Sequence, residues 1–159
     1  MKTITALTRS ILCSIPFLVS LPAAAQARPT TYLNEHSRLC LDVAENRDAG
    51  RVVIARCGDS SQRPFQVWEY LRSGRIVNNR SGMCLDVAEN RRGGQVVIAP
   101  CGNAAARPFQ VWRRAQGRFH NARSGLCLDV AENRDGGRVV IDVCGSYQQH
   151  PYLYWSSGR

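Results

Sequence analysis

Apolar and polar side chains alternate along this chain in short runs. In the segment Cys-Leu-Asp-Val at positions 40–43, Leu41 and Val43 would face one side of an extended strand, and Cys40 and Asp42 the other, because successive side chains of a strand point to opposite faces. This period of two residues, in place of the 3.6 of a helix, predicts β-strands. The same pattern recurs along the chain, so we expect an all-β protein.

The alternating segment belongs to an internal repeat. The sequence CLDVAENR occupies positions 40–47 and returns unchanged at 84–91 and 127–134, a period of 44 and then 43 residues. In each copy a glycine, a valine-rich run and a second cysteine follow, 17 positions after the first cysteine, and a tryptophan stands 11 positions later. Self-similarity at a fixed period of 20–50 residues indicates a repeat architecture.

Each copy contains four short predicted strands. The first is a segment such as 32–34, the second is Cys-Leu-Asp-Val, the third is the valine-rich run after the glycine, and the fourth carries Gln66 and Trp68, or their equivalents, on one face. Three copies are too few for a propeller, which needs typically four to eight blades. Three four-stranded units can instead close around a pseudo-threefold axis as a β-trefoil with one shared core.

The first 27 residues have the composition of a secretion signal. A positively charged start is followed by an apolar run at 11–21 and a small-residue zone at 23–27, with cleavage expected after Ala25 or Ala27. The apolar run is shorter than the roughly 18 residues that a membrane helix needs. We therefore expect no transmembrane segment and a secreted protein, extracellular or periplasmic. One domain would then span residues 28–159, in repeats of about 32–74, 75–117 and 118–159.

Six cysteines follow the signal segment, and an even number suits a disulfide framework in an exported protein. A threefold repeat should pair them symmetrically, either within each copy or cyclically between copies, and pairing within copies is favoured. Zinc is the rival interpretation, but no Cys-x-x-Cys spacing occurs and the three histidines do not recur with the repeat. The predicted disulfides are Cys40–Cys57, Cys84–Cys101 and Cys127–Cys144.

Arginine carries the positive charge. Lys2 is the only lysine, and residues 28–159 hold 19 arginines and 12 acidic residues, a formal charge of +7. The planar arginine fork suits carboxylate, sulfate and phosphate better than lysine does, although a G+C-rich coding sequence would give the same composition. A nucleic-acid partner draws support only from this charge, and secretion argues against it.

The Cys-Leu-Asp-Val and Gln-x-Trp motifs, in three copies after a signal peptide, resemble the repeat of the ricin-type lectins from about residue 32 to residue 155. The resemblance implies a β-trefoil that binds carbohydrate, without a cofactor and without catalysis, and the chain contains no nucleophile elbow, metalloprotease motif or phosphate loop. In that family the glutamine and tryptophan are mainly structural. This assigns a core role to Gln66, Trp68, Gln110, Trp112 and Trp155, while the third copy has Leu153 in place of glutamine.

The family's sugar-binding Asp in Cys-x-Asp carries over at Asp42, Asp86 and Asp129. The other site positions depart from the family pattern. On the strand before the second cysteine, the family's Gln and aromatic residue are replaced by Val53 and Ala55 and their equivalents, so the usual stacking platform is missing. Where the family has Asn before Gln-x-Trp, this chain has an aromatic ring, which would line the opposite wall of the pocket or fill the core: Phe65, Phe109 and Tyr152.

The Glu-Asn-Arg turn after the Asp strand is expected to border the same pocket. Its arginine, Arg47 in the first copy, could reach the carboxylate or sulfate of an acidic glycan through a bidentate contact. Identity of the three turns would also follow from recent duplication, and Asn near a glycine has a conformational role. The turn residues predicted to bind carbohydrate are Glu45, Asn46, Glu89, Asn90, Glu132 and Asn133.

Two alternatives to a plain lectin remain. In the third copy Asp142 should lie near Asp129, which invites a glycosidase interpretation, but the pair exists in one copy only and the sequence shows no environment that would raise a pKa. The second alternative is a protein-interaction subunit with degenerate sugar pockets. Targeting subunits of cytolethal distending toxins are similar in combining a signal peptide with a ricin-type trefoil inside a toxin assembly.

Overall fold

The computed structural model describes residues 28–158, so the predicted signal segment and its cleavage sites lie outside the described residues. These residues form twelve strands and three one-turn 3-10 helices, in the same order in each copy. None of the helices described is long and apolar enough to span a membrane. The predicted all-β architecture is confirmed.

Each copy contributes a first strand, a hairpin, a 3-10 turn and a fourth strand. The first copy comprises β1 (Thr30–Asn34), β2 (Cys40–Val43), β3 (Gly50–Ala55), η1 (Pro64–Gln66) and β4 (Val67–Tyr70). The second comprises β5 (Ile76–Asn78), β6 (Cys84–Val87), β7 (Gly94–Ala99), η2 (Pro108–Gln110) and β8 (Trp112–Ala115). The third comprises β9 (Arg118–Asn121), β10 (Cys127–Val130), β11 (Gly137–Asp142), η3 (Pro151–Leu153) and β12 (Trp155–Ser157).

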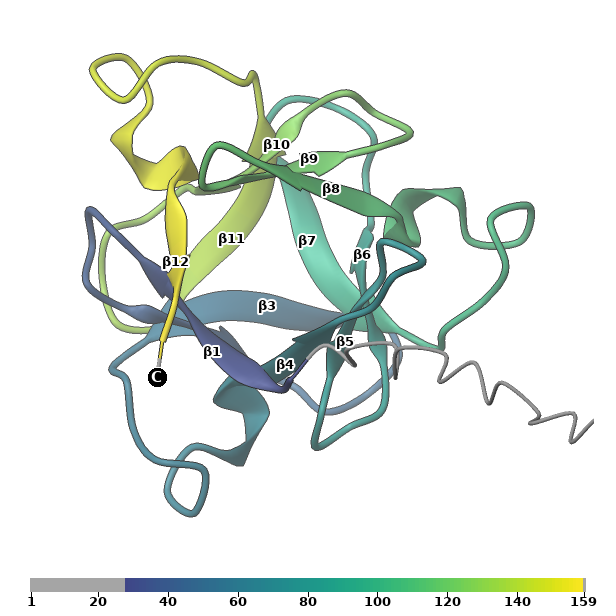
Figure 1. Ribbon diagram of the computed structural model, residues 1–159, viewed down its shortest axis with the longest axis horizontal. Helices are drawn as coiled ribbons and strands as arrows, with labels where there is room; N and C mark the ends of the chain where they lie inside the picture. Colours follow the sequence, from purple (N-terminus) through teal and green to yellow (C-terminus); the bar gives the residue numbers. More distant parts are fainter. Residues whose placement is uncertain (1–27, 159) are drawn as a thin grey trace, which may run out of the picture.

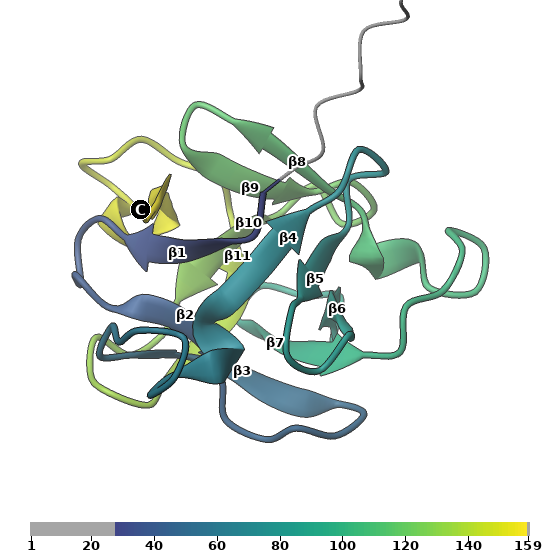
Figure 2. The same cartoon turned by 60° about the horizontal axis from the view of Figure 1, so that its bottom comes forward.

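The copies are joined through their strands in a closed arrangement. The fourth strand of each copy pairs antiparallel with the first strand of the next, as β4 with β5, β8 with β9 and β12 with β1. On the other side, β3, β7 and β11 each pair with the other two and form the triangle seen in Figure 1. Figure 2 shows the β2–β3 hairpin below β1 and β4. The three copies therefore surround one pseudo-threefold axis.

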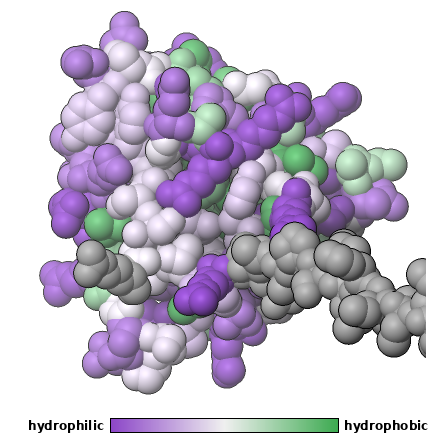
Figure 3. Space-filling model, viewed as in Figure 1, coloured by the Kyte–Doolittle hydropathy of each residue, from purple (hydrophilic) through white to green (hydrophobic). Residues whose placement is uncertain are grey.

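Three buried tryptophans organise the core. Trp68, Trp112 and Trp155 are fully buried, and each indole Nε1 donates a hydrogen bond to a leucine carbonyl on the second strand of its own copy, at 3.0, 3.1 and 3.2 Å. A buried indole N–H needs such a partner, because an unpaired one costs free energy. The leucine, valine and isoleucine side chains of the hairpins pack around these rings, whereas the outer face in Figure 3 is mainly hydrophilic.

The start of the fourth strand differs from the sequence-based expectation. Gln66 and Trp68 were predicted to lie on one strand, but Gln66 closes the 3-10 turn of η1, where its N–H donates to the Arg63 carbonyl at 3.1 Å, and β4 begins at Val67. The physical reason is Pro64, which has no N–H to give to a strand ladder and whose fixed φ suits the first position of a helical turn.

Disulfides staple each copy separately. Cys40 is bonded to Cys57, Cys84 to Cys101 and Cys127 to Cys144, with Cα atoms 5.1, 5.1 and 5.2 Å apart. This is the pairing within copies that the sequence favours. Each closed loop contributes about 3 kcal/mol by the chain-entropy estimate.

The hairpin turns require glycine at one position and favour it at another. A Cβ at Gly50 would lie 1.9 Å from the Glu45 carbonyl oxygen, and the equivalent glycines of the other copies are equally enclosed. One position earlier, the second and third copies have Gly93 and Gly136 with φ of +71° and +75°, whereas the first has Ala49 with φ of +57°. Ala49 therefore holds a backbone conformation that a Cβ disfavours.

Replacing Ala49 by glycine should stabilise the protein. The left-handed conformation costs a residue with a Cβ about 1–2 kcal/mol, and the greater freedom of glycine in the unfolded chain offsets roughly 0.4–1 kcal/mol of that gain. We expect A49G to raise the free energy of unfolding by about 0.5–1 kcal/mol in urea denaturation. The matched change G93A, at a site where a Cβ meets no atom within 4 Å, should lower it. Equal effects of both changes would contradict this explanation.

Candidate functional site

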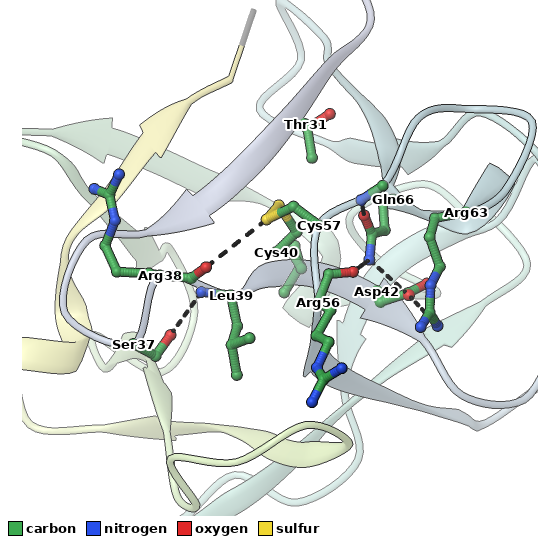
Figure 4. Close-up of a disulfide and its surroundings, with 12 residues drawn as sticks. Thr31, Ser37, Arg38, Leu39, Cys40, Asp42, Arg56, Cys57, Arg63 and Gln66 are labelled. Carbon is green, nitrogen blue, oxygen red and sulfur yellow. Dashed lines mark hydrogen bonds and ion pairs between the residues drawn. A yellow bond between two sulfur atoms is a disulfide. The ribbon is translucent and has the colours of Figure 1, made fainter.

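The Asp of the first copy is buried and held on both oxygens. Asp42 is 6% exposed. Its Oδ1 accepts a hydrogen bond from the Val43 N–H at 2.8 Å, and its Oδ2 accepts one from Gln66 Nε2 at 2.9 Å. Arg63 Nη1 lies 3.9 Å from the same Oδ2. Figure 4 shows the Gln66 amide between the Asp42 carboxylate and the Arg56 carbonyl, with Arg63 beside the carboxylate.

The glutamine is itself fixed at three points. Gln66 Nε2 also donates to the Arg56 carbonyl at 2.9 Å, and Gln66 Oε1 accepts from the Gly58 N–H at 3.0 Å. These partners determine which end of the amide faces Asp42. The residue expected to be structural therefore also orients the candidate sugar-binding carboxylate.

The second copy repeats this geometry closely. Asp86 accepts from the Val87 N–H at 2.8 Å and from Gln110 Nε2 at 3.0 Å, and Arg107 Nη1 lies 3.9 Å from its Oδ2. The two arginines, Arg63 and Arg107, were not singled out from the sequence. The recurring Arg-Pro-Phe-Gln-Val-Trp motif contains them, and it was the only available sign of their position.

The third copy has different chemistry at the same place. Asp129 still accepts from the Val130 N–H at 2.8 Å, but Leu153 replaces the glutamine and His150 replaces the arginine. Leu153 is fully buried, so the volume is filled while the amide hydrogen bonds are absent. Burial raises the pKa of Asp129, and the neighbouring charge of Asp142 adds to the increase.

Asp142 lies near Asp129, as predicted, and is paired with the second copy. Its Oδ1 accepts from Arg92 Nε at 2.8 Å and from the Val143 N–H at 2.6 Å. Burial alone would raise the pKa of Asp142, but these two hydrogen bonds, together with the positive charge of Arg92, outweigh it and hold the pKa below its usual value. Burial raises the pKa of Asp129 in an environment that the sequence does not show, because burial of this carboxyl could not be inferred from the strand pattern.

The Glu-Asn-Arg turns are exposed ion-pair clusters. Glu45 binds Arg47 at 2.6 Å through one oxygen and Arg51 at 2.9 Å through the other, and Glu132 binds Arg134 and Arg138 in the same way at 2.6 and 2.7 Å. Hydrogen bonds from Arg51 and Arg138 lower the pKa of the respective glutamates.

The second copy has Gln95 where the others have this second arginine, so within the described residues Glu89 pairs only with Arg91, at 2.5 Å. The turn arginines that were expected to reach an acidic glycan thus form ion pairs with the glutamates of their own turns. Such exposed pairs contribute little and remain exchangeable. The three asparagines of the turns are all exposed: Asn46, Asn90 and Asn133.

The third strand of each copy lacks an aromatic platform beside the Asp. Val53 and Ala55 are each 5% exposed, and their equivalents in β7 are similarly buried. The aromatic residue before the glutamine or leucine is partly buried in every copy and packs against the core: Phe65, Phe109 and Tyr152.

One cluster in the described part of the chain brings potential metal ligands together. His120, Cys127 and Cys144 have ligand atoms within 4.8 Å of one another. Both sulfur atoms are bonded to each other in the disulfide, and a thiolate, not a disulfide, is the usual metal ligand. The cluster therefore does not provide the ligand set that zinc requires.

Comparisons with known proteins agree with this geometry. The sequence profile of the ricin-type beta-trefoil lectin domain matches residues 29–150. Among curated protein sequences, none matches the chain.

Several solved structures are similar. The agglutinin from Abrus precatorius superposes with a TM-score of 0.72 and 21% identity, covering 87% of this chain and 51% of its own. A non-toxic homologue of type II RIPs from Momordica charantia (bitter gourd), solved in complex with α-methyl-D-galactoside, superposes with a TM-score of 0.70 and 24% identity. The match covers 85% of this chain and 49% of that structure. The hemolytic lectin CEL-III superposes with a TM-score of 0.69 and 30% identity, and the match covers 84% of this chain and 31% of that structure.

This chain thus spans about half or less of the length of these three structures. The trefoil fold and the family resemblance seen in the sequence are confirmed. The chain belongs to the ricin-type β-trefoil lectin domain family and is a sugar-binding module of that family.

Proposed function

We propose that the protein is a secreted, non-catalytic lectin with up to three weak glycan sites, one each at Asp42, Asp86 and Asp129. The observation that carries the proposal is the recurring buried carboxylate, held in each copy by the N–H of the following residue. A carboxylate oxygen has two lone pairs. An oxygen that accepts one hydrogen bond from the protein can still accept another from a sugar hydroxyl.

The expected weak affinity of the sites follows from the side chains beside each Asp. A sugar ring gains affinity by stacking its C–H face on an aromatic side chain, and the third strand has Val53 and Ala55 at the positions where family members stack. Three linked weak sites that engage one surface can still raise the overall avidity by roughly 10² to 10⁴. Binding to dense glycans is therefore expected in preference to free monosaccharides.

Secretion and the lack of catalysis are further parts of the proposal. The three disulfides suit an oxidising compartment. The carboxylate pair of the third copy has no counterpart elsewhere, because the positions of Asp142 in the other copies are Ala55 and Ala99. Arg92 of the second copy forms an ion pair with Asp142 of the third, so the Asp129–Asp142 pair is part of a contact between copies.

A protein-interaction role is the second candidate. The alanines at the stacking positions favour it, because a pocket without a platform serves a sugar poorly. In this case the chain would act as a targeting subunit of a secreted toxin assembly. An absence of glycan binding by the folded, oxidised protein, together with capture of a co-encoded secreted nuclease or pore-former, would support this role over the lectin.

The lectin proposal predicts that the carboxylates are needed for binding. We expect the triple variant D42A/D86A/D129A to lose retention on a glycan array. Since Asp42 and Asp86 also hold buried glutamines, the variant should be less stable by about 1–3 kcal/mol at each of these two sites. Binding must therefore be measured at a temperature where tryptophan fluorescence shows that the variant is folded.

The chain offers a matched control for this loss of stability. In Q66L/Q110L the same Gln–Asp hydrogen bonds are lost, but the carboxylates remain, as they do naturally beside Leu153. This variant should keep the glycan profile with at most a few-fold weaker binding. A triple Asp variant that binds as well as the parent would contradict the proposed sites.

The third pocket yields a separate prediction about ionisation. L153Q would place an amide donor where Gln66 and Gln110 bind their carboxylates, and a hydrogen bond to the charged form lowers a pKa. The NMR titration midpoint of Asp129 should therefore fall toward the usual value for Asp.

The sign of the linked stability change follows from this shift. The raised pKa of Asp129 makes the parent gain stability from this group as the pH falls through that pKa. L153Q should reduce this gain, so the free energy of unfolding of the variant, relative to that of the parent, should be highest near pH 7 and lowest in acid. An unchanged or higher midpoint would show that the amide does not reach Asp129.

A further inference from the structure

A cavity outside the Asp pockets lies where the second and third copies meet. It has a volume of about 320 Å³ and is lined by Arg113, Ala115, His120, Asn121, Ala122 and Gly125. This volume lies within the range of roughly 300–1,000 Å³ typical of small-ligand sites. Neither the sugar-binding carboxylates nor the Glu-Asn-Arg turns take part in it.

Strand register places two polar side chains of the cavity, Arg113 and His120, side by side. In the β8–β9 pair Arg113 lies directly opposite His120. Trp112 and Phe119, which precede them in the two strands, are fully buried. Because side chains alternate across a strand, Arg113 and His120 both project from the outer face. His120 Nδ1 lies 3.4 Å from both sulfurs of the Cys127–Cys144 disulfide, which forms its support.

Arg113 carries an uncompensated charge. Its side chain is exposed and makes no hydrogen bond or ion pair within residues 28–158. The nearby arginines are engaged differently: Arg114 donates to Ser157 Oγ at 2.9 Å, and Arg118 donates to the Gly145 carbonyl at 2.8 Å. None of the six lining residues is acidic. The cavity is therefore lined by one cationic and no acidic side chain, and its guanidinium is free to bind an anion.

The equivalent positions in the other two seams show that this pair is specific to one place. Glu69 lies opposite Val77 between the first and second copies, and Ser156 lies opposite Leu33 between the third and the first. The third–first seam also has a cavity, of about 390 Å³, beside the Cys40–Cys57 disulfide, and Leu33 lines it in place of histidine. Two seams thus have a cavity, whereas the Arg–His pair occurs in one.

We propose that the Arg113–His120 cavity is a separate binding site for the sulfate or carboxylate group of an acidic glycan. The guanidinium fork of Arg113 matches the paired oxygens of such a group, which it can bind through two parallel hydrogen bonds. His120 Nδ1–H faces the disulfide, so the further hydrogen bond comes from Nε2–H of the imidazolium, the form that a bound anion favours. The small side chains Ala115, Ala122 and Gly125 leave room for the sugar ring that carries the anion.

The experiment compares four probes by NMR titration of the ¹⁵N-labelled, oxidised protein at constant ionic strength. The probes are galactose 6-sulfate, galacturonic acid, neutral galactose and inorganic sulfate. We expect saturable shifts at Arg113, His120, Ala122 and Gly125 with the two acidic sugars. Galactose at the same concentration should leave these signals unchanged.

Variants that copy residues of the third–first seam test the two polar side chains. R113S and H120L introduce the serine and leucine of that seam, and each should weaken binding of the acidic sugars about tenfold or more. R80S removes one positive charge from the equivalent turn region of the second copy and should leave the affinity unchanged. Equal losses in R113S and R80S, or shifts that spread over many arginines without saturation, would overturn the site and indicate general charge attraction.

Two outcomes separate this site from the lectin pockets and from a simple ion site. D42A/D86A/D129A should keep acidic-sugar binding at Arg113 even where array binding is lost, so failure of either proposal is visible without the other. Inorganic sulfate that binds as tightly as galactose 6-sulfate would show an anion site alone and overturn the assignment to a glycan.

Discussion

The fourth strand of every copy pairs with the first strand of the next copy, and this constraint determines the rest of the architecture. β4 needs β5, β8 needs β9, and β12 returns to β1, so no copy satisfies its backbone alone. A buried strand with unpaired N–H and C=O groups is costly. Three copies close the ring, and their tryptophans then lie in a single core, each tied by its indole N–H to the hairpin of its own copy.

This closure separates positions that must stay alike from positions that can diverge. Gly50 and its equivalents are confined by a carbonyl oxygen, and the leucines and tryptophans by the core, so all three copies keep them. Outward positions carry no such restraint. The pair Arg113 and His120 has become Glu69 and Val77 in another seam. A threefold scaffold therefore presents surfaces of different charge at places of similar shape.

Much of the fold was predictable from the sequence because buried positions recur at regular intervals along the chain. Alternation at Leu41 and Val43 and the recurring tryptophan come from positions inside the core, and the structure agrees with both. The constant cysteine separation comes from the disulfides, whose second cysteines lie nearer the surface. The role of Gln66 as a strand residue was wrong, because the local effect of Pro64 outweighs the pattern that follows it.

The candidate sites were predicted less completely. The three Asp positions carry over from the family motif, but the glutamine partners of Asp42 and Asp86 lie 24 positions away in the 3-10 turn. Arg92 and Asp142 are 50 positions apart and come from different copies. Arg113 and His120 also belong to different copies, so neither shares a motif with the other. Comparison of the three copies with one another therefore does not reveal contacts that join two copies.

The disulfides connect residues only 17 positions apart and never cross from one copy to another. A chain that crosses a membrane from its amino end into an oxidising compartment would therefore expose both cysteines of one copy before those of the next. Each bond can form in order of emergence, without waiting for the ring to close. Of the 15 pairings open to six cysteines, the native one is then the one that requires the least chain to have arrived.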